Sequence, residues 1–233
     1  MKRLIAIFFL AFLLLKLTAC GDDKKDAENL VWYGFPSLVD TYFVPNAIQI
    51  NKTVSDDDVA VFPYVVLDWG WGDKHYAFDA ENDAEKTNFE KYAIAYGDTL
   101  GDGTHNKQQF VSVLPVLSID VVADKQFDDK HPAGSLLNDL IDINAWRDFY
   151  YALRYKREHN AWIYGQDELL RNLDSISASN PVYMLPKWFL LQFKKNPDTL
   201  GKYNLTISMK CGADPVTGET VELKPVTVEV EFK

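Results

Sequence analysis

The stretch that decides the fold is KYNLTISMKC, residues 202–211 in the last third of the chain. Apolar or aromatic residues alternate in it with polar residues, up to Cys211. Successive side chains of a β-strand point to opposite faces of a sheet, so this alternation predicts a strand with one buried and one solvated face. Val226–Phe232 repeats the pattern, with an inward face of Val226, Val228, Val230 and Phe232.

Further strands are predicted upstream of this pair. Segments rich in β-branched and aromatic residues indicate them at Val59–Trp69, Phe110–Val122 and Tyr183–Phe193. Pro63 lies inside the first of these, which suits an edge strand or a bulge. Residues 27–50, with the apolar stretches Leu30–Phe35 and Ala47–Ile50, are expected to be irregular chain with an entering strand.

Helical spacing occurs in the middle of the chain. A helix face is predicted by Trp146, Phe149, Tyr150 and Leu153, and a second one by Leu169, Leu170, Leu173 and Ile176. Ser135 is placed to cap a short helix over Leu136–Ile141. Residues 81–97 fit a helix or a strand equally well.

These elements together predict a mainly β or α+β fold. We expect an antiparallel immunoglobulin-like β-sandwich with short helical insertions, formed by one globular domain over residues 30–233 with its helical insertion around 135–177. The order Asp198-x-x-Gly201-x-Tyr203 resembles the tyrosine corner of such sandwiches, and it is equally typical of the start of a hairpin.

The N-terminus has the pattern of an export signal. Lys2 and Arg3 precede an apolar run, Leu4–Leu15, and the segment closes with Leu17-Thr18-Ala19-Cys20. This ending resembles the lipobox of bacterial lipoproteins. The resemblance implies that residues 1–19 are removed and that Cys20, now the first residue, carries a lipid that attaches the protein to a membrane.

The residues after Cys20 are expected to form an acidic tether, residues 20–29. Gly21-Asp22-Asp23-Lys24-Lys25-Asp26 is charged and has no apolar side chain to bury. It resembles the surface-export signal of Bacteroidetes lipoproteins, which implies an outer-membrane anchor and a position on the cell surface. The alternative is that the domain faces the periplasm.

Composition excludes some partners. The mature chain would have 21 basic and 34 acidic residues among 214. Nucleic acids are bound mainly by cationic side chains that neutralise phosphates, so no nucleic-acid partner is expected. An aromatic content of 14% is ample for a packed core.

Cys211 is the second of two cysteines and has no partner once Cys20 is lipidated. Its position on the apolar face of the predicted strand favours a buried core thiol over a reactive or metal-binding one.

The centre of the chain carries a family resemblance. Gly101-Asp102-Gly103, Ile119-Asp120-Val121-Val122 and His131-Pro132-Ala133-Gly134-Ser135, followed by Leu137-Asn138-Asp139-Leu140-Ile141, are similar to uncharacterised lipoproteins of Bacteroides and its relatives. The resemblance implies lineage and compartment. Many members have several mature cysteines, and this chain departs from that pattern.

Three triplets resemble the acceptor pattern for O-glycosylation of exported Bacteroidetes proteins: Asp98-Thr99-Leu100, Asp174-Ser175-Ile176 and Asp198-Thr199-Leu200. The resemblance implies modification of Thr99, Ser175 and Thr199.

No pattern of metal or cofactor binding stands out, and no cofactor or metal is expected. The four histidines do not pair at helical spacing, so no zinc helix is predicted. Asp128, Asp129 and His131 suit either a small metal site or a charged turn, and we favour the turn. Asp98, Asp102 and Gly103 suit either a calcium loop or a glycine turn, and again the turn is favoured.

The most unusual surface candidate is the segment from Trp69 to Tyr76. Trp69, Trp71 and Tyr76 offer flat apolar faces on which sugar rings can stack, and Asp73 and His75 offer hydrogen bonds. Both tryptophans point to one face of a strand, so core packing is the favoured interpretation and a ligand platform the alternative.

No catalytic motif is recognisable, and no catalytic residue is assigned. The leading hypothesis is therefore a non-enzymatic binding or assembly module on the outer membrane, with a protein or a glycan as its partner. The alternative is a surface or periplasmic hydrolase with a carboxylate-based site, which requires a deep cleft holding two acids of separated pKa.

Overall fold

The computed structural model describes residues 38–52, 63–68, 75–77, 83–99, 110–145, 147–160 and 169–233. In this part of the chain the fold is mostly β, with antiparallel pairing dominant, which confirms the expectation of a β-rich fold at that level. No helix among these residues is long and apolar enough to cross a membrane.

The decisive stretch forms the central strand of a three-stranded sheet. β10 (Gly201–Cys211) pairs antiparallel with β11 (Val226–Phe232) on one side and with β6 (Val116–Ala123) on the other. The alternation works as predicted, since Tyr203, Leu205, Ile207 and Met209 are buried. The register with β6 shifts between Lys210 and Cys211, where the strand leaves its regular pairing.

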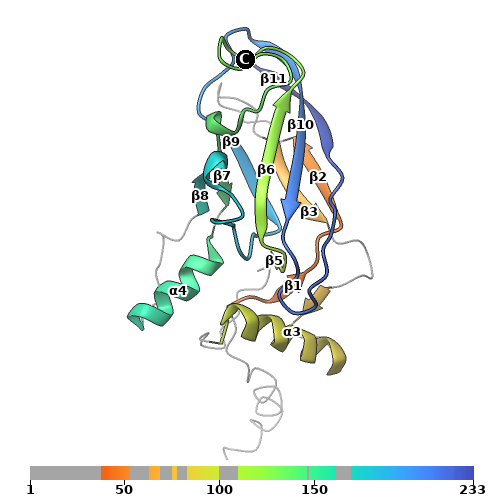
Figure 1. Ribbon diagram of the computed structural model, residues 1–233, viewed down its shortest axis with the longest axis vertical. Coiled ribbons are helices and arrows are strands. Elements are labelled where there is room, and N and C mark those ends of the chain that lie inside the picture. The colour runs from red at the N-terminus through yellow and green to blue at the C-terminus, as the bar shows by residue number, and fades with distance from the viewer. Residues whose placement is uncertain are drawn as a thin grey trace, which may run out of the picture.

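A five-stranded antiparallel sheet faces the first one (Figure 1). Its order is β2-β3-β9-β7-β8, with bounds Ala47–Lys52, Pro63–Asp68, Trp188–Phe193, Ile141–Ala145 and Leu169–Asn172. Pro63 is the first residue of β3, a position that tolerates a residue without an N–H.

The main core lies between these two sheets. It contains the inward residues of both, among them Val65, Ile143 and Leu191 of the large sheet and Leu205 and Ile207 of the small one. Four aromatic rings close one end of this core: Phe127, Phe193, Tyr203 and Phe232, with centroids 5.3 to 6.0 Å apart.

A second core lies at the other end of the molecule. There a small sheet of β4 (His75–Ala77), β1 (Thr41–Phe43) and β5 (Phe110–Ser112) packs against α3 (Asp83–Tyr96). Phe89, Tyr92, Ala93 and Tyr96 of α3 are buried, so helical spacing prevails in the segment that the sequence left ambiguous. Phe149 and Leu153 of α4 (Phe149–His159) belong to the same cluster.

The region 135–177 is less helical than expected. It holds α4 and two 3₁₀ turns, η2 (Asn138–Leu140) and η3 (Leu173–Ser175), but β7 and β8 are strands of the large sheet. The helix predicted from Leu169 to Ile176 is wrong, because residues 169–172 pair with β7. Ser135 caps no helix; its hydroxyl donates to the Pro132 carbonyl at 2.7 Å.

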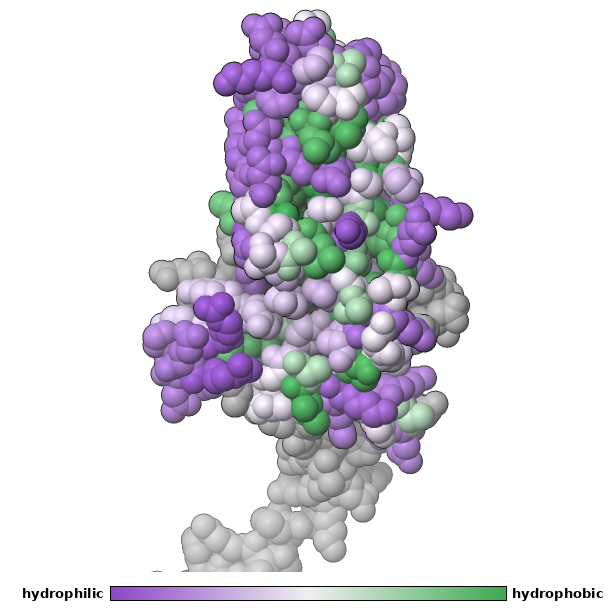
Figure 2. All heavy atoms as spheres, viewed as in Figure 1, coloured by the Kyte–Doolittle hydropathy of each residue, from purple (hydrophilic) through white to green (hydrophobic). Residues whose placement is uncertain are grey.

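The molecule has two distinct ends (Figure 1). β1, α3 and α4 lie at the lower end, and the C-terminus lies at the upper end beside the loops that follow β6 and precede β10. Figure 2 shows hydrophilic side chains gathered at the upper end and over α4.

The Tyr203 side chain joins two segments at the upper end of the molecule. Its hydroxyl donates to the carbonyl of Thr199, four residues earlier, at 2.6 Å, and lies 3.3 Å from the carbonyl of Gln126. The side chain therefore connects the start of β10 to the loop that follows β6.

Candidate functional site

A polar cavity lies at the upper end. Its volume is about 260 Å³, and apart from Leu140 its lining is ionisable: Asp128, Asp129, Lys130, His131, Asp139, Lys195 and Asp198. We call it the histidine pocket. The turn after β6, the 3₁₀ turn η2 and the loop after β9 each supply part of it.

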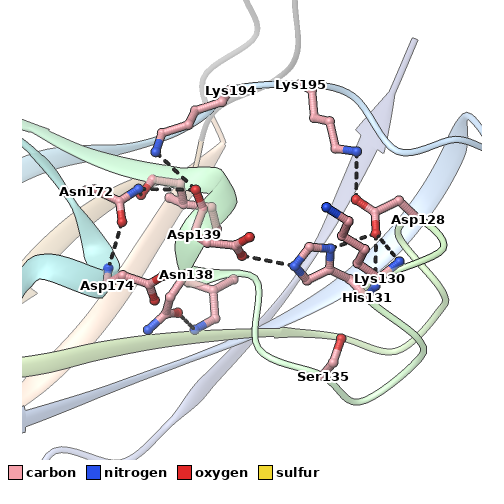
Figure 3. Close-up of polar contacts among 12 residues, drawn as sticks. Asp128, Lys130, His131, Ser135, Asn138, Asp139, Asn172, Asp174, Lys194 and Lys195 are labelled. Atoms are coloured by element: carbon pink, nitrogen blue, oxygen red, sulfur yellow. Dashed lines mark hydrogen bonds and ion pairs between the residues drawn. The ribbon is translucent and has the colours of Figure 1, made fainter.

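His131 lies between two carboxylates (Figure 3). Its Nδ1 is 2.6 Å from Asp128 Oδ1, and its Nε2 is 3.0 Å from Asp139 Oδ1. The imidazole is nearly buried, with 8% of the residue exposed, whereas the side chain of Asp139 is 51% exposed. Lys195 reaches Asp128 from the other side, with Nζ 2.6 Å from Oδ2.

Local sequence explains why Asp128 and His131 meet. The Asp128 carboxylate accepts the backbone N–H groups of Lys130 and His131, both at 2.8 Å, which is an aspartate-stabilised turn. The turn is closed by Phe127, whose N–H donates to the His131 carbonyl at 2.8 Å. The predicted charged turn at residues 128–131 is thus present.

The charges determine the protonation state of the pocket. Burial alone would lower the pKa of His131, but the hydrogen bond to the Asp128 carboxylate and the charge of Asp139 outweigh it and raise the pKa above its ordinary value. The ammonium group of Lys195, followed by His131 and two backbone N–H groups, holds the pKa of Asp128 well below its usual range despite some desolvation. These interactions favour the charged forms of both His131 and Asp128.

The carboxylates of Asp128 and Asp139 engage both ring nitrogens of His131, and we call this arrangement the clamp. An ionised carboxylate can only accept, so each short contact to His131 requires a proton on the ring nitrogen. An imidazole with both nitrogens protonated cannot act as a general base.

The same contacts oppose metal binding at this position, because a histidine ligand needs an unprotonated nitrogen. Within the described ranges, no group of three or more His, Cys, Asp or Glu side chains is placed to hold a metal ion.

The clamp predicts a pH dependence. Because the folded-state pKa of His131 is raised, its contribution to stability is complete below roughly pH 6.5, the unfolded value, and is lost as pH rises through the folded-state pKa. An NMR titration should give His131 a pKa above the ordinary value, and Asp139→Asn should lower it. An ordinary pKa in the wild type, or no response to Asp139→Asn, would contradict the clamp.

The predicted platform is only partly within the described residues. Trp69, Trp71 and Asp73 lie outside them. His75 and Tyr76 lie in β4, both half-buried. The Tyr76 ring stacks on Tyr92 of α3 at 5.0 Å between centroids and packs against the second core. Tyr76 therefore serves in packing, whereas the core interpretation of Trp69 and Trp71 concerns residues outside the described ranges.

The three predicted glycosylation positions are all exposed. Thr99 follows α3, and Thr199 lies in the turn before β10. Ser175 lies in η3, where its hydroxyl donates to the Asn172 carbonyl at 2.7 Å. Modification of all three positions stays a prediction, as does lipidation of Cys20, which lies outside the described residues.

Asp98 has a different role from the calcium ligand considered above. It is fully buried and accepts three hydrogen bonds, from the backbone N–H groups of Leu38 (2.5 Å) and Val39 (3.0 Å) and from the hydroxyl of Tyr42 (2.8 Å). Its oxygens hold the segment before β1 against the end of α3. Asp102 and Gly103 lie outside the described residues.

Cys211 is half-buried and packs against both cores. Burial raises the pKa of its thiol to about 12. Because the thiolate is the reactive form, this environment makes the thiol unreactive, in agreement with the core interpretation.

Sequence reasoning missed Asp139 and Lys195, two of the four residues that form the clamp. No local pattern connects them to His131, since Lys195 is far along the chain and Asp139 belongs to a separate turn. Only pairing between elements brings them together. Comparison with protein-family models, with curated proteins and with solved structures finds no match for this chain.

Proposed function

We propose that the protein is an outer-membrane lipoprotein whose immunoglobulin-like β-sandwich acts as a non-enzymatic binding or assembly module. The anchor part rests on Leu17-Thr18-Ala19-Cys20 and on the acidic residues that follow. The observation that carries the non-enzymatic part is the engagement of both ring nitrogens of His131 by carboxylates in the histidine pocket.

The strand order supports the immunoglobulin-like assignment. In constant-type domains the sheets have the orders A-B-E-D and G-F-C. Here β2, β3, β9 and β7 lie in the first order, and β11, β10 and β6 lie in the second, when the strands are lettered along the chain. β8 extends the large sheet. β4, α3 and β5 are an elaboration between strands B and C, and β1, which precedes strand A, completes their small sheet.

Tyr203 gives independent support for that assignment. It lies near the start of strand F, and its hydroxyl bonds back to the carbonyl of Thr199, which is the geometry of a tyrosine corner. The inter-sheet disulfide of antibody domains has no counterpart, because Cys211 is the only cysteine outside the signal and lipobox region.

The position of the two ends supports an orientation. The described chain begins just before β1 at the lower end, so a lipid on Cys20 would hold that end toward the membrane. The histidine pocket and the C-terminus would then face away from it. This is the orientation expected of a module that presents its surface to a partner.

Two measurements on cells test the proposal. In detergent phase partitioning, the wild-type protein should enter the detergent phase and Cys20→Ala should stay in the aqueous phase. Protease treatment of intact cells should remove the C-terminal strands on a blot, with lysed cells as the control. Equal partitioning of the two proteins would end the anchor hypothesis, and loss only in lysed cells would place the domain in the periplasm.

The hydrolase alternative requires two carboxyl groups of separated pKa in one cleft. Burial does raise the pKa of Asp148, yet this residue caps the N-terminus of α4, where it accepts the Tyr151 N–H at 2.8 Å. Asp148 does not line the histidine pocket. The described geometry therefore favours binding over hydrolysis.

A further inference from the structure

The two carboxylates of the clamp differ in how firmly the protein holds them. Asp128 is buried, and its oxygens accept the backbone N–H groups of Lys130 and His131, both at 2.8 Å. The ammonium group of Lys195 lies 2.6 Å from its second oxygen. None of these three contacts involves the imidazole ring. The Asp128 carboxylate is therefore held in place whether the ring is charged or neutral.

The Asp139 carboxylate is held by the ring alone. Its side chain is 51% exposed, and among the described residues its one hydrogen-bond partner is Nε2 of His131, at 3.0 Å. The other contacts of this residue use the backbone carbonyl, which accepts Nδ2 of Asn172 at 3.2 Å and Nζ of Lys194 at 3.0 Å. The carboxylate can therefore turn into solvent without a movement of the chain.

The backbone of η2 is fixed independently of the clamp. The Leu140 carbonyl accepts the N–H of Lys194 at 2.9 Å, and the Asn138 side chain accepts the N–H of Val121 at 3.1 Å. These bonds tie η2 to the end of β9 and to β6. A change in the charge of the clamp should consequently move the Asp139 side chain and leave the turn where it is.

Three segments direct ionisable groups toward His131. The turn after β6, η2 and the loop after β9 contribute Asp128, Asp129, Lys130, Asp139, Lys195 and Asp198. The nearby Lys194 is paired with Asp142 of β7 at 3.2 Å. With a protonated ring the pocket lining has four acids against three cations, and with a neutral ring it has four acids against two. Loss of the proton therefore increases the repulsion on the exposed carboxylate.

The hydrogen-bonding capacity of the ring sets which contact is lost. A neutral imidazole has one N–H group, so it can donate to only one of the two carboxylates. The other ring nitrogen then directs a lone pair at a carboxylate oxygen, and two acceptors cannot form a hydrogen bond. Because Asp128 is fixed and Asp139 can reach water, the proton stays on Nδ1 and the contact at Nε2 breaks.

We propose that His131 is a proton-dependent switch of the Asp139 carboxylate. The protonated ring keeps the carboxylate at the lining of the histidine pocket, and the neutral ring releases it to solvent, which opens the pocket on the side of η2. Since the pKa of His131 is raised, the switch is closed at its ordinary value of about 6.5 and opens as the pH rises through the folded-state pKa. This device goes beyond the proposed binding function and does not depend on the membrane anchor.

NMR of the full mature protein in detergent micelles, with ¹⁵N in the histidine rings, tests the switch. Below the pKa of His131 both ring nitrogens should be protonated, and the couplings of the Asp139 β-protons should show one fixed side-chain rotamer. Above that pKa the ring should keep its proton on Nδ1, and the Asp139 couplings should change to those of an averaged rotamer.

Two variants make the test specific. In Asp139→Asn, the amide can accept from a protonated Nε2 and donate to a neutral one, so the side chain should keep one rotamer at both pH values. Asp129→Asn is the matched control, because it removes an exposed carboxylate of the same pocket that makes no contact with the ring within the described residues. This control should respond to pH as the wild type does.

Three outcomes would overturn the switch. One is a wild-type Asp139 rotamer that stays the same on both sides of the His131 titration. The second is a neutral ring that is protonated at Nε2, since Asp128 would then be the carboxylate released. The third is loss of the response in Asp129→Asn, which would assign it to the overall charge of the pocket.

Discussion

Asp98→Ala is expected to lower the free energy of unfolding by at least about 3 kcal/mol, which is a large share of the stability of an ordinary domain. The change removes the carboxylate that accepts three hydrogen bonds. The backbone N–H groups of Leu38 and Val39 then lose this acceptor inside the protein. Urea denaturation followed by circular dichroism measures the loss.

Two further variants separate the hydrogen bonds from the general cost of mutation. Asp98→Asn keeps one acceptor oxygen and nearly the same volume, so its loss should be smaller than that of Asp98→Ala. Asp174→Ala changes an exposed aspartate in a related triplet and should stay within about 0.5 kcal/mol of the wild type. Equal midpoints for Asp98→Ala and Asp174→Ala would show that the buried carboxylate contributes nothing.

Phe127→Ala is expected to cost about 3–5 kcal/mol. Phe127 is fully buried, and its ring contacts Phe193, Tyr203 and Phe232 with centroids 5.6, 6.0 and 5.6 Å away. These three residues come from both sheets, so the cavity would form where the sheets are joined. Guanidinium denaturation gives the free energy, and near-ultraviolet circular dichroism reports the loss of ring order.

Phe127→Leu is the matched control for volume. Leucine fills much of the space, and the backbone bonds from Phe127 to His131 and from Asp198 to Phe127 persist in either variant. The loss should therefore be clearly smaller than for alanine. If Phe127→Ala lowers the free energy of unfolding by less than about 1 kcal/mol, the four aromatic rings do not hold the two sheets together as described.

The alternation of apolar and polar residues in the sequence predicted most of the β-strands. β10 and β11 were predictable because their buried and exposed residues alternate without interruption, and that pattern fits only a strand with one face in a core. The helix α4 was predictable for the same reason, since Phe149 and Leu153 are four residues apart and both buried.

The failure at Leu169–Ile176 has a physical cause. Four leucine and isoleucine positions matched a helix, yet residues 169–172 gain more from pairing with β7, through Ala145↔Leu169 and its neighbours. Leu170 is left 60% exposed on the outer face of the large sheet, where the helical pattern had placed it on a buried face. A short apolar pattern is a weak local preference, and pairing with a formed sheet edge overrides it.

The sequence by itself therefore determined the β-rich class and the apolar surroundings of Cys211, and it predicts the lipobox at Cys20 as an expectation, because each follows from local order along the chain. Only the tertiary structure decided which polar groups meet. Asp139 and Lys195 reach the Asp128–His131 turn through the packing of elements that are distant in sequence. Such contacts depend on strand order and register, which no local pattern encodes.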